Sequence, residues 1–509
     1  MSYTIEQKIG KHTYIYEVES YWDKTKKQPR QNRKYIGKKH PETGKIISTN
    51  GRYASLDYGT VYFLDKITKK TGLKKLLKNI FPNIYSELIA LIFFSISEKK
   101  PLYLAKLWLE STYYSTKEDL SSQRISEVLK KLGKDYESRL SFLKKWAKMH
   151  SDSSFIVFDI TSFSSYSKKL ELLEWGYNRD KEKLPQVNFG LIYGEPSALP
   201  LFYSIYPGSI SDVSTLTNMI LYLDWLELKN SLFILDKGFY SLYNLGKIEK
   251  DMHFLIPLPY SVKAALKLIE KHNSIGSHKN AFILNGNVCY CATDKITVGG
   301  KSYCAYIYLD EKRRAEKRNI FLKKIFELEK KVSDISFKDK KELEDYLKDS
   351  TCGWKNIFSI YKCRDKFELK RNDKEINSSL EKMGTTILIT NKKIEPKHAL
   401  SLYRRKDGVE KFFDSMKNDI DKKRLRTGDK EIFLGRLFLD FITLVVYSQI
   451  SKIARQEKIV KDYTIQELMY EFKKIKLIKL GEKKTIITEV SKKQRELLKK
   501  FNIDYPVKT

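Results

Sequence analysis

Apolar and polar positions along this 509-residue chain follow two different periods. Over residues 61–150, and again over 434–453, the apolar residues recur with the spacing of a helix. Two short continuous apolar runs, 154–159 and 231–236, are rich in β-branched and aromatic residues, which is typical of strands buried on both faces. The pattern predicts a multidomain α/β protein in which a helical region precedes a mixed sheet.

The predicted order around these runs is strand, hairpin, helix, strand, helix, strand over residues 151–260, with a returning strand at 385–390. Each of the two runs ends in an aspartate, Asp159 or Asp236. Open α/β sheets bind ligands at the carboxyl ends of their strands, so we expect both aspartates at such ends. An aspartate in this position can also simply cap a turn, so either one alone is weak support for a site.

A third acid lies on an amphipathic stretch, residues 401–420. On a helix, its apolar residues share one broad side, and four polar residues fall in a narrow arc beside it. The apolar set is Leu402, Val409, Phe412, Phe413, Met416 and Ile420, and the polar set is Tyr403, Lys406, Glu410 and Lys417. These charges also fit a solvated face with intrahelical pairs such as Lys406 with Glu410. The two upstream aspartates shift the balance toward a functional site.

Asp159, Asp236 and Glu410 together are a natural ligand set for Mg²⁺, a hard cation that prefers oxygen donors. Two such ions can activate a water or hydroxyl group and stabilise the leaving oxygen in phosphoryl transfer. This chemistry does not by itself distinguish nucleases, polymerases and recombinases.

In combination, these residues resemble the DD-E transposases of bacterial insertion sequences, in the branch with a Tyr-x2-Arg-x3-Glu-x6-Lys signature. Here the signature is Tyr403, Lys406, Glu410 and Lys417, with lysine where the family usually has arginine. Lysine keeps the charge but loses the bidentate fork. Asp159 matches the first acid, and Asp236, with Asn244 following, matches the second. The resemblance is firmest over residues 155–259 and 385–447.

The resemblance implies a ribonuclease-H-like catalytic core, a mixed sheet with helices, formed by residues 151–260 and 384–450. It implies that Asp159, Asp236 and Glu410 are catalytic and hold two Mg²⁺ ions, for which Mn²⁺ would substitute. Tyr403, Lys406 and Lys417 would contact DNA. Such an enzyme binds terminal inverted repeats, cuts the element ends, joins them to target DNA, and forms a homodimer on paired ends. The alternatives are a metal-dependent nuclease with the same core and a catalytically inactive DNA-binding relic.

The remaining segments are assigned around this core. Residues 1–60 alternate like strands and contain a basic hairpin, which fits either a DNA contact or an ordinary solvated hairpin. Residues 61–150 form the expected DNA-end-binding domain; within it a helix over 121–133 fits either groove recognition or plain packing. The 174 residues from Asp236 to Glu410 are too many for a loop. We therefore expect an inserted domain at 261–383, β-rich by the resemblance, and a C-terminal helical region at 451–509 with assembly as one role.

The net charge of the chain indicates a class of binding partner. The chain has 96 Lys and Arg against 63 Asp and Glu, a net charge of +33 that points to a polyanion, either nucleic acid or an anionic membrane surface. The first residues lack an apolar signal region, and the longest apolar runs are too short to span a bilayer. We therefore expect a cytoplasmic, nucleoid-associated protein that acts on double-stranded DNA without a membrane.

The cysteines and one tryptophan leave alternatives. All five cysteines lie between Cys289 and Cys363, but no Cys-x2-Cys pair supports zinc, so reduced thiols are expected. Trp354 fits stacking on an unpaired base or a place in the core.

Overall fold

The computed structural model divides into two compact units. It describes residues 2–10, 12–23, 26–39, 46–47, 53–150, 155–167, 169–176, 184–195, 197–228, 231–250, 252–350, 353–363, 366–414, 417, 427–480 and 484–506. The first unit, here the helical unit, comprises Met1–Trp146, Met416–Lys422 and Thr427–Thr509. The second, here the sheet unit, comprises Ala147–Ser415 and Lys423–Arg426. Each unit contains segments that are far apart in the sequence.

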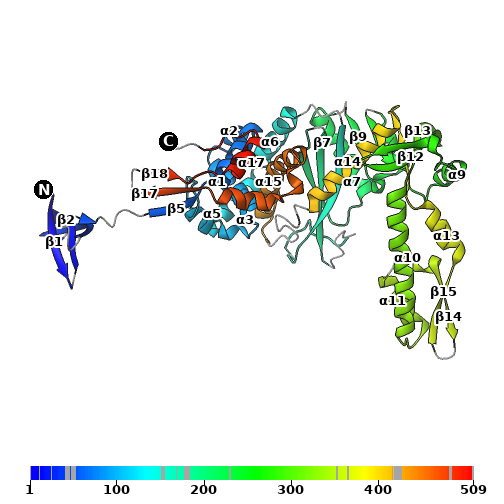
Figure 1. The fold of residues 1–509 in the computed structure, drawn as a ribbon, viewed down its shortest axis with the longest axis horizontal. Coiled ribbons are helices and arrows are strands. Elements are labelled where there is room, and N and C mark those ends of the chain that lie inside the picture. The colour runs from blue at the N-terminus through cyan, green and yellow to red at the C-terminus, as the bar shows by residue number, and fades with distance from the viewer. Residues whose placement is uncertain are drawn as a thin grey trace. The chain divides into compact units, whose positions relative to one another are not determined.

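The sheet unit is built on a nine-stranded mixed sheet with the order β11-β12-β13-β16-β10-β9-β6-β7-β8. Figure 1 labels β7, β9, β12 and β13 of this sheet. Its strands are β6 (Phe155–Ser164), β7 (Gln186–Glu195), β8 (Leu199–Pro207), β9 (Leu232–Ile234), β10 (His253–Pro257), β11 (Ala281–Leu284), β12 (Asn287–Val298), β13 (Lys301–Asp310) and β16 (Thr385–Thr390). β6, β7 and β8 are antiparallel, whereas β9 pairs in parallel with both β6 and β10. All ten residues of β6 are buried, as expected for a continuous apolar run in a central strand. The predicted multidomain α/β architecture with a large mixed sheet is confirmed.

The helices of the sheet unit connect its strands. They are α7 (Asp212–Trp225), η2 (Lys237–Phe239), α8 (Leu242–Ile248), α9 (Lys263–Lys271), η3 (His278–Asn280) and α14 (Pro396–Asp414). α7 leads into β9, α8 leads into β10, and α14 follows β16. The β9–α8–β10 segment thus joins two parallel strands through a helix, which is the connection that parallel pairing requires.

The segment expected as a separate β-rich domain, 261–383, is different in the structure. β11, β12 and β13 belong to the main sheet, because β13 pairs along β16 from Cys304↔Thr390 to Leu309↔Thr385. The rest is mainly helical, and we call residues 311–383 the arm. The arm contains α10 (Glu311–Asp334), α11 (Lys340–Ser350), α12 (Trp354–Ile357), the hairpin of β14 (Phe358–Cys363) and β15 (Lys366–Arg371), and α13 (Asp373–Lys382). The side chain of Trp354 and all of Cys352 lie outside the described part.

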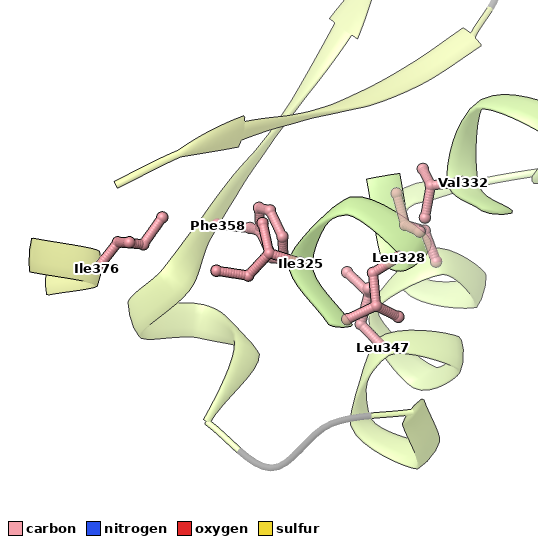
Figure 2. Packing of buried hydrophobic residues seen from close by; sticks show 7 residues of the cluster. Ile325, Leu328, Val332, Leu347, Phe358 and Ile376 are labelled. Atoms are coloured by element: carbon pink, nitrogen blue, oxygen red, sulfur yellow. The ribbon is translucent and has the colours of Figure 1, made fainter. Parts of the chain in front are cut away.

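The arm has a hydrophobic core of its own (Figure 2). The core consists of Ile325, Leu328, Val332, Leu343, Leu347, Phe358 and Ile376. Three of these residues lie on one face of α10 at helical spacing, and the others come from α11, β14 and α13. β12 and β13 therefore belong to the core sheet rather than to the arm.

The helical unit collects helices from both ends of the sequence. Its elements are β5 (Tyr53–Asp57), α1 (Gly59–Lys70), α2 (Leu73–Ile80), α3 (Tyr85–Glu98), η1 (Leu102–Leu104), α4 (Ala105–Glu110), α5 (Ser122–Lys134), α6 (Tyr136–Met149), α15 (Lys430–Gln456), η5 (Ile459–Lys461), α16 (Ile465–Lys473), β17 (Lys476–Leu480), β18 (Lys484–Ile487) and α17 (Lys492–Lys500). β17 pairs with β5, and the ring of Phe63 lies 4.6 Å from that of Phe472 and 4.9 Å from that of Phe501. The last part of the chain therefore shares one core with residues 53–146.

The placement of α15 also differs from the expected domain division. α15 was expected to belong to the catalytic core that ends at residue 450, but it packs against α3 and α5 of the helical unit. The reason is that α15 is apolar on nearly every side, so it is buried among helices rather than laid on a sheet by one stripe. Among the described residues, none of the helices combines the length and apolar composition that a membrane-spanning segment requires.

α5 begins where the sequence predicts, and its packing explains its composition. The Ser121 hydroxyl accepts a hydrogen bond from the Arg124 amide at 3.1 Å, which caps the helix. The Arg124 guanidinium contacts Glu87 at 3.2 Å, and the Glu87 side chain is fully buried. The leading arginine of the helix is therefore held by a carboxylate of its own unit, as the packing alternative expects.

Residues 2–47 include a small antiparallel sheet with the order β1-β2-β3-β4. Its strands are β1 (Ser2–Ile9), β2 (His12–Asp23), β3 (Gln28–Lys39) and β4 (Ile46–Ile47). The alternating pattern of the sequence predicts strands here, and β2 and β3 form the hairpin that holds the basic stretch.

Candidate active site

The pairing of β6 with β9 determines where the first two predicted acids lie. The two strands are parallel, and their register pairs Val157 with Ile234. Asp159 and Asp236 each follow this pair by two residues. Because side chains alternate along extended chain, each aspartate lies on the same face as the pair preceding it. The sheet therefore places the two carboxylates at equivalent positions on adjacent strands.

Asp159 lies inside its strand rather than at the strand's carboxyl end, which corrects the sequence prediction. β6 continues to Ser164 because β7 remains its partner there, and Asp159 itself pairs with Leu191. On the opposite side the ladder has already ended, since β9 stops at Ile234. The Asp159 side chain is buried, and its Oδ1 accepts a hydrogen bond from the Ile160 amide at 2.9 Å.

Asp236 follows the end of β9, as predicted, and its backbone remains extended (φ −81°, ψ 162°). Its side chain is 36% exposed. The segment after it is held by Asn244, whose buried Nδ2 donates to the carbonyl oxygens of Phe239 at 2.9 Å and Val213 at 3.0 Å. Asp236 is thus a partly exposed carboxylate, and the turn after it is held by the hydrogen bonds of Asn244.

Lys406 of α14 reaches Asp236. Its Nζ lies 3.4 Å from Asp236 Oδ1, and the lysine side chain is only 5% exposed. A buried ammonium is stabilised only with an anionic or hydrogen-bonding partner, and Asp236 is one such partner. The ion pair brings the amphipathic helix predicted from the sequence to the aspartates.

Two arginines that precede Lys406 hold α14 on the sheet. Arg404 makes an ion pair with Asp310 at the end of β13, and its Nη2 also contacts Cys289 Sγ at 3.6 Å. Arg405 Nη1 lies 3.4 Å from Glu195 Oε2 of β7. Three consecutive basic residues therefore fasten one turn of α14 to three separate parts of the sheet. The basic run Arg404-Arg405-Lys406 is visible in the sequence, but its partners on the sheet are not.

The Arg404 partner also connects α14 to the arm. The side chain of Asp310 is 6% exposed, and its Oδ1 accepts the Arg313 amide at 3.0 Å, which caps α10. Burial raises the pKa of the neighbouring Cys289 thiol above its ordinary value, so this sulfur is protonated at neutral pH. One buried carboxylate thus caps the first helix of the arm and anchors α14.

For the other predicted site residues, the structure gives the position in the chain and, for two of them, the burial of the side chain. Tyr403 lies in α14, half-buried, three residues before Lys406. Glu410 belongs to the same helix one turn after Lys406, but its side chain lies outside the described part. Lys417 is described without its immediate neighbours, and its side chain is buried. The structure therefore relates Asp159, Asp236 and Lys406, whereas Glu410 remains a prediction from the sequence.

The donor set fits a hard divalent cation. Two carboxylates at equivalent positions supply oxygen ligands of the kind that Mg²⁺ prefers, and Asp236 already accepts one cationic group, the Lys406 ammonium. Within the described residues there is no cluster of three His, Cys, Asp or Glu side chains that would hold a metal ion. The third ligand would be Glu410.

Comparison with known proteins gives a matching family and similar solved structures. A family model described as "Transposase DDE domain" matches residues 150–439. No curated protein matches the sequence. A piggyBac transposase synaptic complex with hairpin DNA, determined by cryo-electron microscopy, aligns with 81% of this chain and 78% of that chain, at 9% sequence identity and a TM-score of 0.36.

Proposed function

Because the chain belongs to the transposase DDE domain family, we propose that it cuts DNA at the ends of a mobile element and joins those ends to target DNA. The match covers the segment that carries Asp159, Asp236 and Lys406. The observation that carries the proposal is the β6–β9 register, with the ion pair from α14 added to it.

The strand order supports a ribonuclease-H-like core. In the sheet unit the order β8-β7-β6-β9-β10 comprises an antiparallel meander followed by two strands parallel to its first member. This is the strand, hairpin, helix, strand, helix, strand sequence expected from the family resemblance. We therefore assign catalysis to this part of the sheet and propose the arm and β11–β13 as additions to it.

In the proposed mechanism, Asp159, Asp236 and Glu410 hold two Mg²⁺ ions, for which Mn²⁺ would substitute. When bound, such ions activate a water or a 3′ hydroxyl group and stabilise the leaving oxygen of the phosphodiester. Lys406 would orient the Asp236 carboxylate through their contact at 3.4 Å. Lys406, Tyr403 and Lys417 are proposed to contact the DNA phosphates beside the cut.

The partners follow from the same proposal. The net charge of +33 suits double-stranded DNA, both the terminal inverted repeats and the target. A homodimer on paired ends and a place in the bacterial cytoplasm, at the nucleoid, are parts of the proposal that come from the family resemblance.

The test of the proposal is cleavage and joining by the purified protein. Labelled duplexes taken from the DNA on either side of the gene are incubated with a supercoiled plasmid, in Mg²⁺, in Mn²⁺ and in excess chelator. We expect nicks at the element boundary and end-joined plasmid with either metal, and neither product in chelator. Nicking without joining would instead indicate a metal-dependent nuclease, and binding without nicking a DNA-binding relic.

Arg404 provides a further prediction for the same assay. Arg404→Ala removes one of the three anchors of α14, so we expect turnover to fall about tenfold while the affinity for DNA is unchanged, the loss that supporting residues of a metal site commonly show. Arg404→Lys keeps the charge and should recover part of the rate. Arg371→Ala, which breaks the ion pair with Glu329 inside the arm, is the matched control and should leave turnover unchanged. Equal losses for the Arg404→Ala and Arg371→Ala variants would contradict a positioning role for Arg404.

A further inference from the structure

The hairpin of β2 and β3 extends beyond the rest of its sheet. β1 pairs with β2 only as far as Ser2↔Glu19, whereas β2 and β3 continue to pair from Ser20↔Gln31 to Asp23↔Gln28. The residues of this two-stranded ribbon are exposed, apart from the partly exposed Asp23 near the turn. Asp23 stabilises the turn, because its Oδ1 accepts the Lys26 amide at 3.1 Å and its Oδ2 lies 3.4 Å from Arg30 Nε. The ribbon is thus an ordered projection that buries little of its own surface.

The two faces of the hairpin carry different charges. Alternation along the strands assigns Tyr3, Ile5, Tyr16, Val18, Ser20, Trp22, Pro29, Gln31, Arg33 and Tyr35 to one face, which we call the acid-free face. The opposite face carries Glu17, Glu19 and Asp23 beside Arg30, Asn32 and Lys34. Cross-strand pairing sets Glu17 against Lys34, so the opposite face balances its own positive charge. The acid-free face instead presents the Arg33 cation among aromatic, apolar and uncharged polar side chains.

Hydrogen bonds link the polar side chains of the acid-free face to one another. Gln31 Nε2 donates to the Tyr3 hydroxyl at 2.9 Å, and Arg33 Nη2 donates to Gln31 Oε1 at 3.3 Å. Tyr3 is 47% exposed and Trp22 61% exposed, although Val18 between them is completely buried. The acid-free face therefore presents planar donors together with aromatic rings on a solvent-exposed surface.

We propose that this ribbon enters the major groove of duplex DNA with the acid-free face on the base edges. The inference rests on the proposed function, since it names the surface that recognises the element ends. A major groove about 12 Å wide admits a two-stranded ribbon, and arginine and glutamine are the side chains that pair with guanine and adenine edges. From Ser20 to Lys34 the sequence has six basic residues and one acid, so its charge matches a polyphosphate. The lysine and arginine side chains outside the acid-free face would contact DNA phosphates, and these contacts would carry no sequence information.

Because side chains alternate between the two faces of the hairpin, each face can be altered separately by a matched double variant. Gln31→Ala with Arg33→Ala alters the acid-free face, and Asn32→Ala with Lys34→Ala alters the opposite face. Each double variant removes one amide and one positive charge from exposed positions of the same strand, so both should fold like the wild type. The affinity of the full-length protein is measured for end duplexes from the gene's own flanks and for scrambled duplexes of equal length, over a series of salt concentrations.

We expect the ratio of end affinity to scrambled affinity to fall roughly 5- to 100-fold in the acid-free-face variant. The opposite-face variant should weaken both duplexes by the same factor and leave the ratio unchanged. Arg33→Lys should lower the ratio while keeping the salt dependence, because lysine lacks the bidentate fork.

Two results would overturn the proposal. Equal changes of the ratio in both double variants would mean that the ribbon supplies charge alone. A wild-type ratio in the acid-free-face variant, in a protein that still nicks the element boundary, would place recognition elsewhere and leave the transposase proposal intact.

Discussion

Asp236→Asn is expected to reduce metal-dependent nicking of the element ends by at least about 10³-fold, with little change in DNA affinity. The substitution keeps the shape of the side chain and removes its charge, and the carboxylate lies in the site opposite Lys406. Asp159→Asn should have an effect of similar size, because the β6–β9 register gives both aspartates equivalent positions. The measurement is single-turnover cleavage of labelled end duplexes over a series of Mg²⁺ concentrations.

The matched control is Asp294→Asn in β12 of the same sheet. Asp294 also contacts basic side chains, Lys271 at 2.7 Å and His272 at 2.9 Å, but it lies three strands beyond β10. Its variant should cut at the wild-type rate. A loss as large as that of Asp236→Asn would mean that sheet stability, and not the site, limits cleavage.

Lys406→Met distinguishes two roles for Asp236. If the aspartate only pairs with the lysine, Lys406→Met and Asp236→Asn should cause equal losses. If the aspartate holds a metal ion, the lysine variant should cut faster than the aspartate variant and respond to added Mg²⁺, because both carboxylates remain. Nicking that survives both Asp159→Asn and Asp236→Asn would show that other carboxylates carry the reaction.

The elements that the sequence predicts well are those whose signals are local. β6 and β9 are continuous apolar runs, α5 starts at a serine cap, and α14 has an apolar stripe, so each can be recognised without its partners. The candidate site residues Asp159 and Asp236 are predicted in the same way, as polar residues that interrupt or follow buried strands.

The features that the sequence could not show depend on distant partners. Arg404 and Asp310 are 94 residues apart, and Arg405 and Glu195 are 210 apart, so no spacing rule indicates these anchors. β17 was missed because its partner β5 lies at the other end of the chain. β6 was expected to end at Asp159 because a single sequence does not show that β7 pairs with it as far as Ser164. In each case the element is local, but its limits and contacts are set by tertiary pairing.

Gly435→Ala is expected to lower the free energy of unfolding of the helical unit by about 2 kcal/mol or more, and Gly435→Val by more than that. α15 and α5 cross at two glycines. A Cβ at Gly435 would overlap the Leu129 carbonyl oxygen, and one at Gly133 would overlap the Glu431 carbonyl oxygen. The obstacles are backbone atoms of well-packed helices, which cannot rotate away as a flexible side chain can.

Whether Gly435→Ala raises or lowers the free energy of unfolding depends on two opposing contributions, helix propensity and steric overlap. Alanine in a helix interior is favoured over glycine by about 1 kcal/mol, so replacement in open space should stabilise. A Cβ added at Gly246 in α8 would have no described atom within 4 Å, and Gly246→Ala is therefore the control that reports propensity alone. At Gly435 an added Cβ would force the two helices apart. Their separation would reduce the burial of Leu129, Leu132 and Leu437. We expect this loss of burial to outweigh the gain in helix propensity. Urea unfolding followed by helix signal measures both variants. Equal stabilisation by Gly246→Ala and Gly435→Ala would contradict backbone contact between α5 and α15, whereas opposite signs would show that the crossing tolerates no side chain.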